Sequence, residues 1–264
     1  KFCLDNLTGF DPEQLVAAAD MQELDRWAVT RLNSLIRRVF DSYDAYEFHA
    51  VSHAINDFCV VDLSSFYFDI IKDRLYCDGE NSLSRRSAQT ALFLIVDAMT
   101  RMFAPILAFT CEEIWLAMPH RQADDGRSVL FNCMVQPYED YALPEDAMDR
   151  WARIAAVRSA VNGALEQARA DKTIGKSLEA EVDVTVPAED AFLADMDADT
   201  LADLLIVSQV RVTVGDALSV TVAPAQGVKC ARCWKVLTSV GTVAGHDTLC
   251  PRCAAVVKAL PVVE

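Results

Sequence analysis

The chain has 264 residues, of which 52% are hydrophobic, enough to build packed cores and to exclude an intrinsically disordered protein. Its formal net charge of -15 at pH 7 argues against general attraction to nucleic acids or anionic membranes. No apolar run reaches the roughly 18 residues that suggest a membrane-spanning helix. The first residues, KFCLDNLTGF, carry neither a secretory signal nor an initiating Met, so we expect a piece of a longer protein.

The charge is distributed unevenly along the chain. Residues 229–264 hold five Lys or Arg residues and two acidic ones, a net charge of +3, so the remaining residues carry -18. Because salt screens charges beyond about 10 Å, a local basic tip can still bind an anionic partner. This contrast favours a selective contact over a broad electrostatic surface.

Nine cysteines are present, four of them clustered near the end and five scattered among apolar neighbours. An odd number with dispersed single residues is typical of buried free thiols in a reducing compartment, not of a disulfide framework. We therefore predict a cytoplasmic protein. The scattered cysteines are Cys3, Cys59, Cys77, Cys111 and Cys133.

Residues 1–118 are predicted to be helical, because apolar residues recur every three or four positions without strand-like alternation. The predicted helices cover 24–40, 48–59, 63–75, a stretch capped by Ser84 that runs to 103, and one that starts at Pro105. A polar, proline-containing connection follows over 119–148.

Beyond this connection, a helix is predicted from about Asp146 to Ala170, and the hydrophobic period then changes to two. Alternation predicts strands over 178–186, 207–214 and 218–224, with a helix over 190–206 between the first two. The expected fold class is mostly α, with a helical bundle, a small α+β junction domain and a C-terminal zinc ribbon or knuckle. The predicted domain bounds are 1–145 for the bundle, 146–226 for a helix plus the junction domain, and 227–264 for the zinc module.

The zinc module is predicted from the pattern C-x2-C-x16-C-x2-C. Its members Cys230, Cys233, Cys250 and Cys253 offer four thiolates on two tight turns, which suits tetrahedral zinc. Two redox pairs are the alternative, but a redox pair needs a strand-to-helix setting. Since the protein fills all four positions, we predict one structural zinc ion and no catalytic metal.

Polar and aromatic residues lie on or beside the two ligand turns. They are Arg232, Trp234, Lys235 and Arg252. A guanidinium can pair with phosphates or base edges, and an indole can stack on an unpaired base. The alternative is that Trp234 covers the zinc site while the arginines only solubilise it, and the spacing alone leaves both interpretations open.

Two other motifs are weaker. His49 and His53 are four apart on a predicted helix, but no third metal ligand accompanies them. The stretch TIGKS (173–177) is similar to the end of a phosphate-binding loop, but Ala170 replaces its first glycine and a helix precedes it. We predict neither a metal site nor a nucleotide loop there, and we find no catalytic residues in the chain.

Five segments carry a resemblance to a known family. They are LDRWAVTRLN, AYEFHAVSHAINDFCVVDLSSFYFDIIKDRLY, RRSAQTALFLIVDAMTRMFAPILAFTCEEIW, ARADKTIGKSLEA and CARCW…CPRC. In this order, over nearly the whole chain, they resemble the C-terminal part of bacterial-type isoleucyl-tRNA synthetases of class I. The terminal four-cysteine module distinguishes this family from the valine and leucine enzymes.

The resemblance implies that the bundle and the zinc-bearing tail recognise tRNA(Ile) within a monomeric ligase. ATP and Mg²⁺ would be used only in a catalytic domain upstream, because HIGH-type and KMSKS-type signatures are absent here. It also implies an editing domain upstream of this chain. This chain would then supply tRNA recognition and no bond chemistry.

The resemblance also implies roles for single residues. Trp234 would stack on an anticodon base, Arg232 and Arg252 would pair with the RNA, and Lys235 is a further candidate. Lys172 and Lys176, in the ARADKTIGKSLEA segment, are also expected to contact tRNA. We expect weak and salt-sensitive binding. The alternatives are a helical scaffold whose zinc ribbon binds a protein and a non-catalytic tRNA-binding paralogue.

Overall fold

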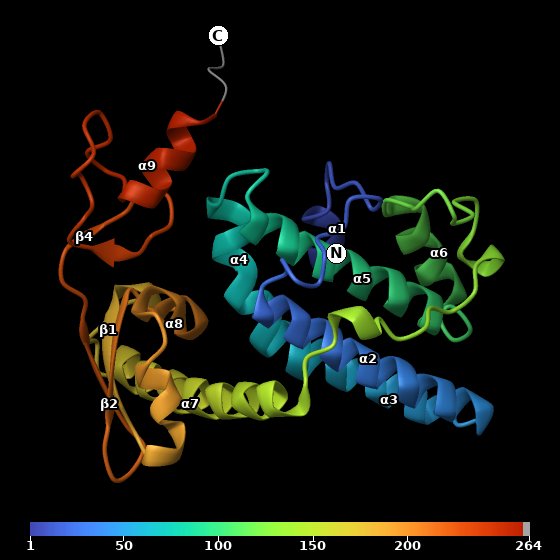
Figure 1. Cartoon of the computed structure of the whole chain (residues 1–264), viewed down its shortest axis with the longest axis horizontal. Helices are drawn as coiled ribbons and strands as arrows, with labels where there is room; N and C mark the ends of the chain where they lie inside the picture. Colours follow the sequence, from blue (N-terminus) through green and yellow to red (C-terminus); the bar gives the residue numbers. More distant parts are fainter. Residues whose placement is uncertain (261–264) are drawn as a thin grey trace. The chain divides into compact units, whose positions relative to one another are not determined.

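The computed structural model describes residues 1–260 and divides them into two compact units (Figure 1). The helical unit consists of residues 1–75 and 80–145, and the C-terminal unit consists of residues 76–79 and those from 146 onward. The mostly α fold class agrees with the prediction. A separate domain boundary near residue 226 stays a prediction.

Nine α-helices and several short 3-10 turns make up most of the described residues. The α-helices are α1 (Phe2–Asp5), α2 (Glu23–Asp44), α3 (Phe48–Asp57), α4 (Phe68–Cys77), α5 (Leu83–Phe103), α6 (Ala108–Ala117), α7 (Glu145–Ala170), α8 (Ala198–Leu205) and α9 (Pro251–Lys258). The 3-10 turns are η2 (Val129–Phe131), η3 (Glu139–Tyr141), η4 (Ser177–Glu179) and η5 (Ala188–Ala194). In the described chain, no helix is both long and apolar enough to span a bilayer.

The centre of the helical unit is α2, which packs against α3 and α5 (Figure 1). Its predicted apolar face is buried, including Trp27, Leu32 and Ile36. The face repeats at helical spacing, so burying it against two neighbouring helices stabilises α2 more than intrinsic propensity does.

A π-helix, η1 (Phe58–Tyr67), joins α3 directly to α4. Two separate helices were predicted here. The five-residue interval between Phe58 and Leu63, both buried, fits the wider π turn, and the Ser65 hydroxyl donates to the carbonyl of Val60, five residues earlier, at 2.7 Å. The three segments therefore form one continuous helical rod.

Two predicted helix starts are wrong. The N-cap of α5 is Ser82, whose hydroxyl accepts from the backbone N–H of Arg85 at 3.2 Å, whereas the Ser84 hydroxyl accepts from Arg74. Pro105 lies in the turn after α5, and α6 begins only at Ala108 because its preceding residue has a non-helical backbone.

A buried polar network ties α2 to α4 and α5. Asp25 is fully buried and accepts hydrogen bonds from Arg74 at 3.1 and 2.5 Å, from the Tyr67 hydroxyl at 2.7 Å and from Ser87. Burial, and then the nearby Asp25 carboxylate, hold the pKa of Tyr67 well above its ordinary value. Tyr67 therefore stays a neutral hydrogen-bond donor.

The C-terminal unit contains a three-stranded sheet with the order β2-β1-β3. Its strands are β1 (Ala180–Val186), β2 (Gln209–Val214) and β3 (Ser219–Pro224). The central strand β1 pairs parallel with β2, where Val182 faces Val210, and antiparallel with β3, where Val182 faces Val222. Alternate side chains of β1 are buried, as the period of two predicts.

The crossover from β1 to β2 contains η5 and α8 in place of the predicted continuous helix over 190–206. The helix starts afresh at Asp197, whose carboxylate accepts from the backbone N–H of Thr200 at 2.8 Å. A good N-cap inside the apolar pattern thus divides the segment in two.

The scattered cysteines are free, but they are not uniformly buried. Cys77 and Cys111 are buried, Cys3 and Cys59 are half-buried, and Cys133 is exposed. The prediction of five buried thiols is therefore wrong for Cys133, which is exposed in the irregular connection after α6.

Candidate zinc site and nucleic-acid interface

The four-cysteine module is built on two short strands and one helix. The first Cys pair follows β4 (Val228–Lys229), which pairs with β5 (Val236–Leu237), and the second pair starts α9. Gly227 has φ +124°, and a Cβ there would meet the carbonyl carbon of Leu237 at 2.3 Å. Only glycine allows the two strands to approach in this way.

The four cysteine sulfurs all lie within 4.8 Å of one another and are buried. The Sγ atoms of Cys233 and Cys250 are 3.9 Å apart. Tetrahedral zinc with bonds of about 2.3 Å requires sulfurs about 3.8 Å apart, so the residues fit the ion. Among the described residues this is the one such group of His, Cys and acidic side chains.

Backbone hydrogen bonds prepare the first ligand for metal binding. The N–H of Cys250 donates to the Cys230 sulfur at 3.4 Å. Burial raises the pKa of Cys230, but N–H groups of Cys233, Cys250 and Arg232 outweigh it and bring the value to about 6. These donors favour the thiolate, which is the form that binds zinc. The ion would pin the two turns together and supply no bond chemistry.

Trp234 directly follows the second cysteine ligand and is 56% exposed. Its backbone is left-handed, with φ +66°, and its N–H donates to the Cys230 carbonyl at 3.0 Å. Such a conformation costs a non-glycine residue about 1 kcal/mol or more. The ligand turn therefore presents a large aromatic side chain at a position where glycine would be less strained.

Lys176 lies against this indole, with its Nζ 5.6 Å from the ring centroid. At this distance the cation interacts with one ring face. Lys176 belongs to the loop after α7, and so does Lys172, which is exposed. The structure therefore brings Trp234 and Lys176, both predicted RNA contacts, together.

The other predicted RNA contacts have partners within the C-terminal unit. Lys235 is buried and forms an ion pair with Asp203 of α8. The Arg232 guanidinium donates to the carbonyl of Cys77, and Arg252 pairs with Asp78 at 3.5 Å. Their roles in RNA binding stay predictions, while their contacts within the unit are structural.

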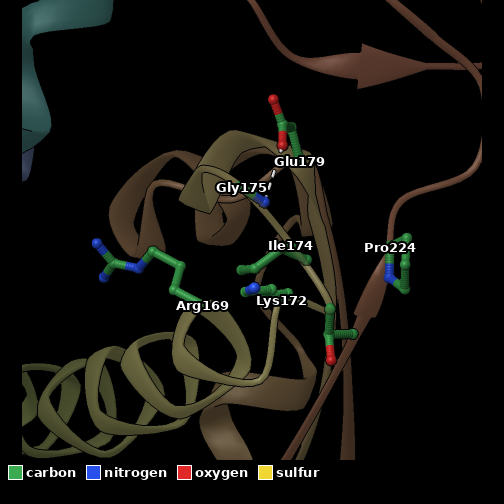
Figure 2. Close-up of a pocket in the computed structure, with 7 residues that line it drawn as sticks. Arg169, Lys172, Ile174, Gly175, Glu179 and Pro224 are labelled. Atoms are coloured by element: carbon green, nitrogen blue, oxygen red, sulfur yellow. Dashed lines mark hydrogen bonds between the residues drawn. The ribbon is translucent and has the colours of Figure 1, made fainter.

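A cavity of about 410 Å³ opens at the end of α7 (Figure 2). It is lined by Arg169, Lys172, Thr173, Ile174, Gly175, Glu179 and Pro224. Arg169 was not predicted as a site residue. Its position three residues before Lys172, one helical turn away, was the available signal.

The rejected motifs remain outside any described site. His49 and His53 are exposed and do not belong to the metal-binding group. TIGKS follows a helix, so it lacks the strand that precedes a phosphate-binding loop.

Comparison with known proteins agrees with this geometry. Residues 25–184 match the model of the family described as "Anticodon-binding domain of tRNA ligase". The chain belongs to this family. Residues 227–256 match the model described as "Zinc finger found in FPG and IleRS", which covers all four cysteines. With the sulfur geometry, this match assigns one structural zinc ion to the module.

This anticodon-binding chain is also similar to longer proteins named isoleucine–tRNA ligase. It is 44% identical to the one from Syntrophotalea carbinolica, over 97% of this chain and 28% of that protein. The proteins from Desulforamulus reducens and Colwellia psychrerythraea are 44% and 41% identical, over 98% and 96% of this chain and 29% of each relative. The chain thus spans less than a third of the length of these relatives.

Proposed function

We propose that the chain reads the anticodon of tRNA(Ile), with Trp234 as the residue that stacks on an anticodon base. The observation that carries this proposal is the exposed indole held in a strained backbone on a zinc-ligand turn. Strain of this kind persists where the surroundings fix it, and it is concentrated at functional sites. Membership in the anticodon-binding family supports the same conclusion.

The physical basis is the structure of the ligand. Proteins read RNA sequence mostly at unstacked bases, and an anticodon lies in a single-stranded loop. Stacking on an aromatic ring contributes about 1–3 kcal/mol per base. Because the zinc-ligand turn fixes the backbone that carries the ring, less ordering is required on binding, and more of this energy remains as affinity.

In the whole protein, we propose that this chain positions tRNA(Ile) for a ligase that activates isoleucine with ATP and Mg²⁺ elsewhere in its sequence. The names of the similar proteins support this assignment. The anticodon stem-loop is the proposed partner, and the ligase is proposed to act as a monomer. The five scattered cysteines, none of them in a disulfide, support a reducing compartment, for which we propose the cytoplasm.

Arg232, Arg252 and Lys235 enter the proposal as supporting residues. Each of them contacts a carboxylate or carbonyl of the C-terminal unit and so holds the four-cysteine module against α8 or against residues 77–78. An RNA phosphate would have to share or replace these partners. Trp234, Lys172 and Lys176 are therefore the stronger candidates for direct contact.

The test is a titration of the zinc-loaded chain with the tRNA(Ile) anticodon stem-loop and with stem-loops changed at single anticodon bases. Trp234→Ala is measured in parallel at one salt concentration. We expect wild-type binding to depend on the anticodon base and the variant to lose affinity. Equal binding of all stem-loops, or none, with Trp234→Ala unchanged, would contradict the proposal and favour a protein-binding ribbon.

A further inference from the structure

The loop that ends α7 has an unusual residue at its turning point. The N–H of Thr173 donates to the Ala168 carbonyl and that of Lys172 to the Arg169 carbonyl, which together form a Schellman cap. The residue that turns the chain in this motif is usually glycine, but here it is Lys172, with φ +60°. A charged residue thus occupies the left-handed backbone position, and it lines the cavity.

The cavity carries two cations and a carboxylate that is already engaged. Lys172 and Arg169 contribute the positive charges; the Arg169 Nε donates to the Leu165 carbonyl at 3.3 Å, and Figure 2 shows its guanidinium extending outward from the cavity. Glu179 accepts from the N–H groups of Gly175 and Lys176 at 3.1 and 3.2 Å, and it pairs with Lys229 at 3.6 Å. Figure 2 shows its carboxylate turned toward Gly175. Because these donors compensate its charge, the cations of the cavity can attract an anion.

The cavity is linked to the Trp234 ring through one lysine side chain. Gly175 lines the cavity, and the next residue, Lys176, places its ammonium over the indole. The Lys176 side chain thus spans from the cavity wall toward the ring, and a strand of several nucleotides that contacts the ring passes along the α7 loop. The Lys176 ammonium lies on one ring face, which directs a stacking base to the other.

We propose that the α7 loop and Trp234 form one binding site for several nucleotides of single-stranded RNA. One base stacks on the ring face opposite Lys176, and a phosphate of the same strand binds at the rim of the cavity, where Lys172 and the outward-pointing Arg169 supply the positive charges. This proposal rests on the proposed function. It adds an RNA-phosphate subsite, assigns Arg169 to it, and makes Lys176 a positioning residue for the indole.

The cavity suits this ligand in chemistry as well as in place. Guanidinium and ammonium groups are the usual partners of RNA phosphates, while Ile174 and Pro224 give apolar walls for the sugar. About 410 Å³ lies within the range of small-ligand pockets. A phosphate contact of this kind fixes the register of the strand without reading its sequence.

The test compares Lys172→Gly, Arg169→Ala and, as a charge-matched control on α9, Lys258→Ala. Lys172→Gly removes the cation and relieves the left-handed backbone, so a loss of affinity does not reflect unfolding. The measurement is the dependence of stem-loop affinity on salt from 50 to 200 mM. Each lost phosphate contact should reduce the slope of log affinity against log salt by about 0.7, which changes the affinity ratio across this range about 2.6-fold.

A second arm locates the phosphate. Stem-loops carry a neutral methylphosphonate at one loop position at a time. We expect one position at which the modification weakens wild-type binding and at which Lys172→Gly has no further effect. Lys176→Met, which keeps the stem but not the charge, should weaken discrimination among anticodon bases more than it changes the salt slope.

The outcomes separate this proposal from the proposed function. If Lys172→Gly and Arg169→Ala keep the wild-type slope while Trp234→Ala still weakens anticodon-dependent binding, the phosphate subsite is wrong and the anticodon role stands. A slope reduced equally by Lys258→Ala would also overturn the subsite. If the wild-type chain binds no stem-loop, the proposed function fails, and the subsite fails with it.

Discussion

Replacing Trp234 by glycine should change the stability of the four-cysteine module only slightly while it weakens RNA binding. The side chain is 56% exposed, so about 110 Å² of a surface of about 250 Å² is covered. At about 25 cal/mol per Å², losing this contact costs about 2.8 kcal/mol. Glycine adopts the left-handed backbone without strain, which restores about 1–2 kcal/mol of stability, whereas alanine keeps the strain.

Trp234→Gly should therefore be about 1 kcal/mol or more stable than Trp234→Ala. Both losses are small beside the roughly 10–16 kcal/mol that a structural zinc contributes, so both variants should keep their zinc. The affinity for the stem-loop should fall by the same amount in both variants. Both lose the stacked base, worth about 1–3 kcal/mol, which corresponds to about 5- to 150-fold in affinity.

The assay combines zinc content, thermal unfolding of the zinc-loaded chain and stem-loop titration for wild type and both variants. We expect equal zinc content, glycine above alanine in stability, and equally weakened binding. If the glycine variant were less stable than the alanine one, the left-handed conformation at this position would be wrong. If the glycine variant bound the stem-loop as tightly as wild type, Trp234 would not be the stacking residue.

Three further predictions concern other parts of the chain. Removing zinc with a chelator should expose four additional thiols to a thiol reagent and unfold the knuckle, whereas amide exchange in α2 and α5 stays slow; protection of the knuckle amides after chelation would contradict this. In the zinc-loaded protein at pH 8, exposed Cys133 should react fastest, and Cys111 slowly because burial raises its pKa to about 11, as mass spectrometry of the labelled peptides would establish. Asp25→Asn should destabilise the helical unit by about 3–5 kcal/mol in denaturant unfolding, because Arg74 loses its buried counter-charge, and a loss below 1 kcal/mol would refute that role.

The helical parts of the fold could be predicted because their apolar periods are long and regular. The predicted face of α2 is the buried one, and α7 occupies nearly the predicted range. The π-helix was not predicted, because its apolar residues are nearly continuous and show no single period. The start of α5 was misplaced because two serines, Ser82 and Ser84, are equally good caps in sequence.

The zinc ligands could be predicted from spacing alone, but the state of the neighbouring charges could not. Lys235 lies among the ligand turns in sequence, yet its ion pair is with Asp203, 32 residues earlier. The left-handed backbones of Lys172 and Trp234 also carry no sequence signal. Glycine normally marks such positions, and here it is replaced by the residues that we propose for RNA contact.

These contacts reduce the positive charge that the basic C-terminal segment, residues 229–264, presents to a ligand. Four of its five cations have partners: Lys229 pairs with Glu179, Arg232 with the Cys77 carbonyl, Lys235 with Asp203 and Arg252 with Asp78. Because Lys229, Lys235 and Arg252 pair with carboxylates of the unit, the net charge of +3 overstates the attraction that this segment exerts on an RNA. In the proposed complex, affinity comes from stacking on Trp234 and from the few cations of the α7 loop. The proposal therefore predicts that this acidic chain binds RNA at one place, where selectivity depends on the Trp234 ring and a small cavity more than on the net charge of the protein.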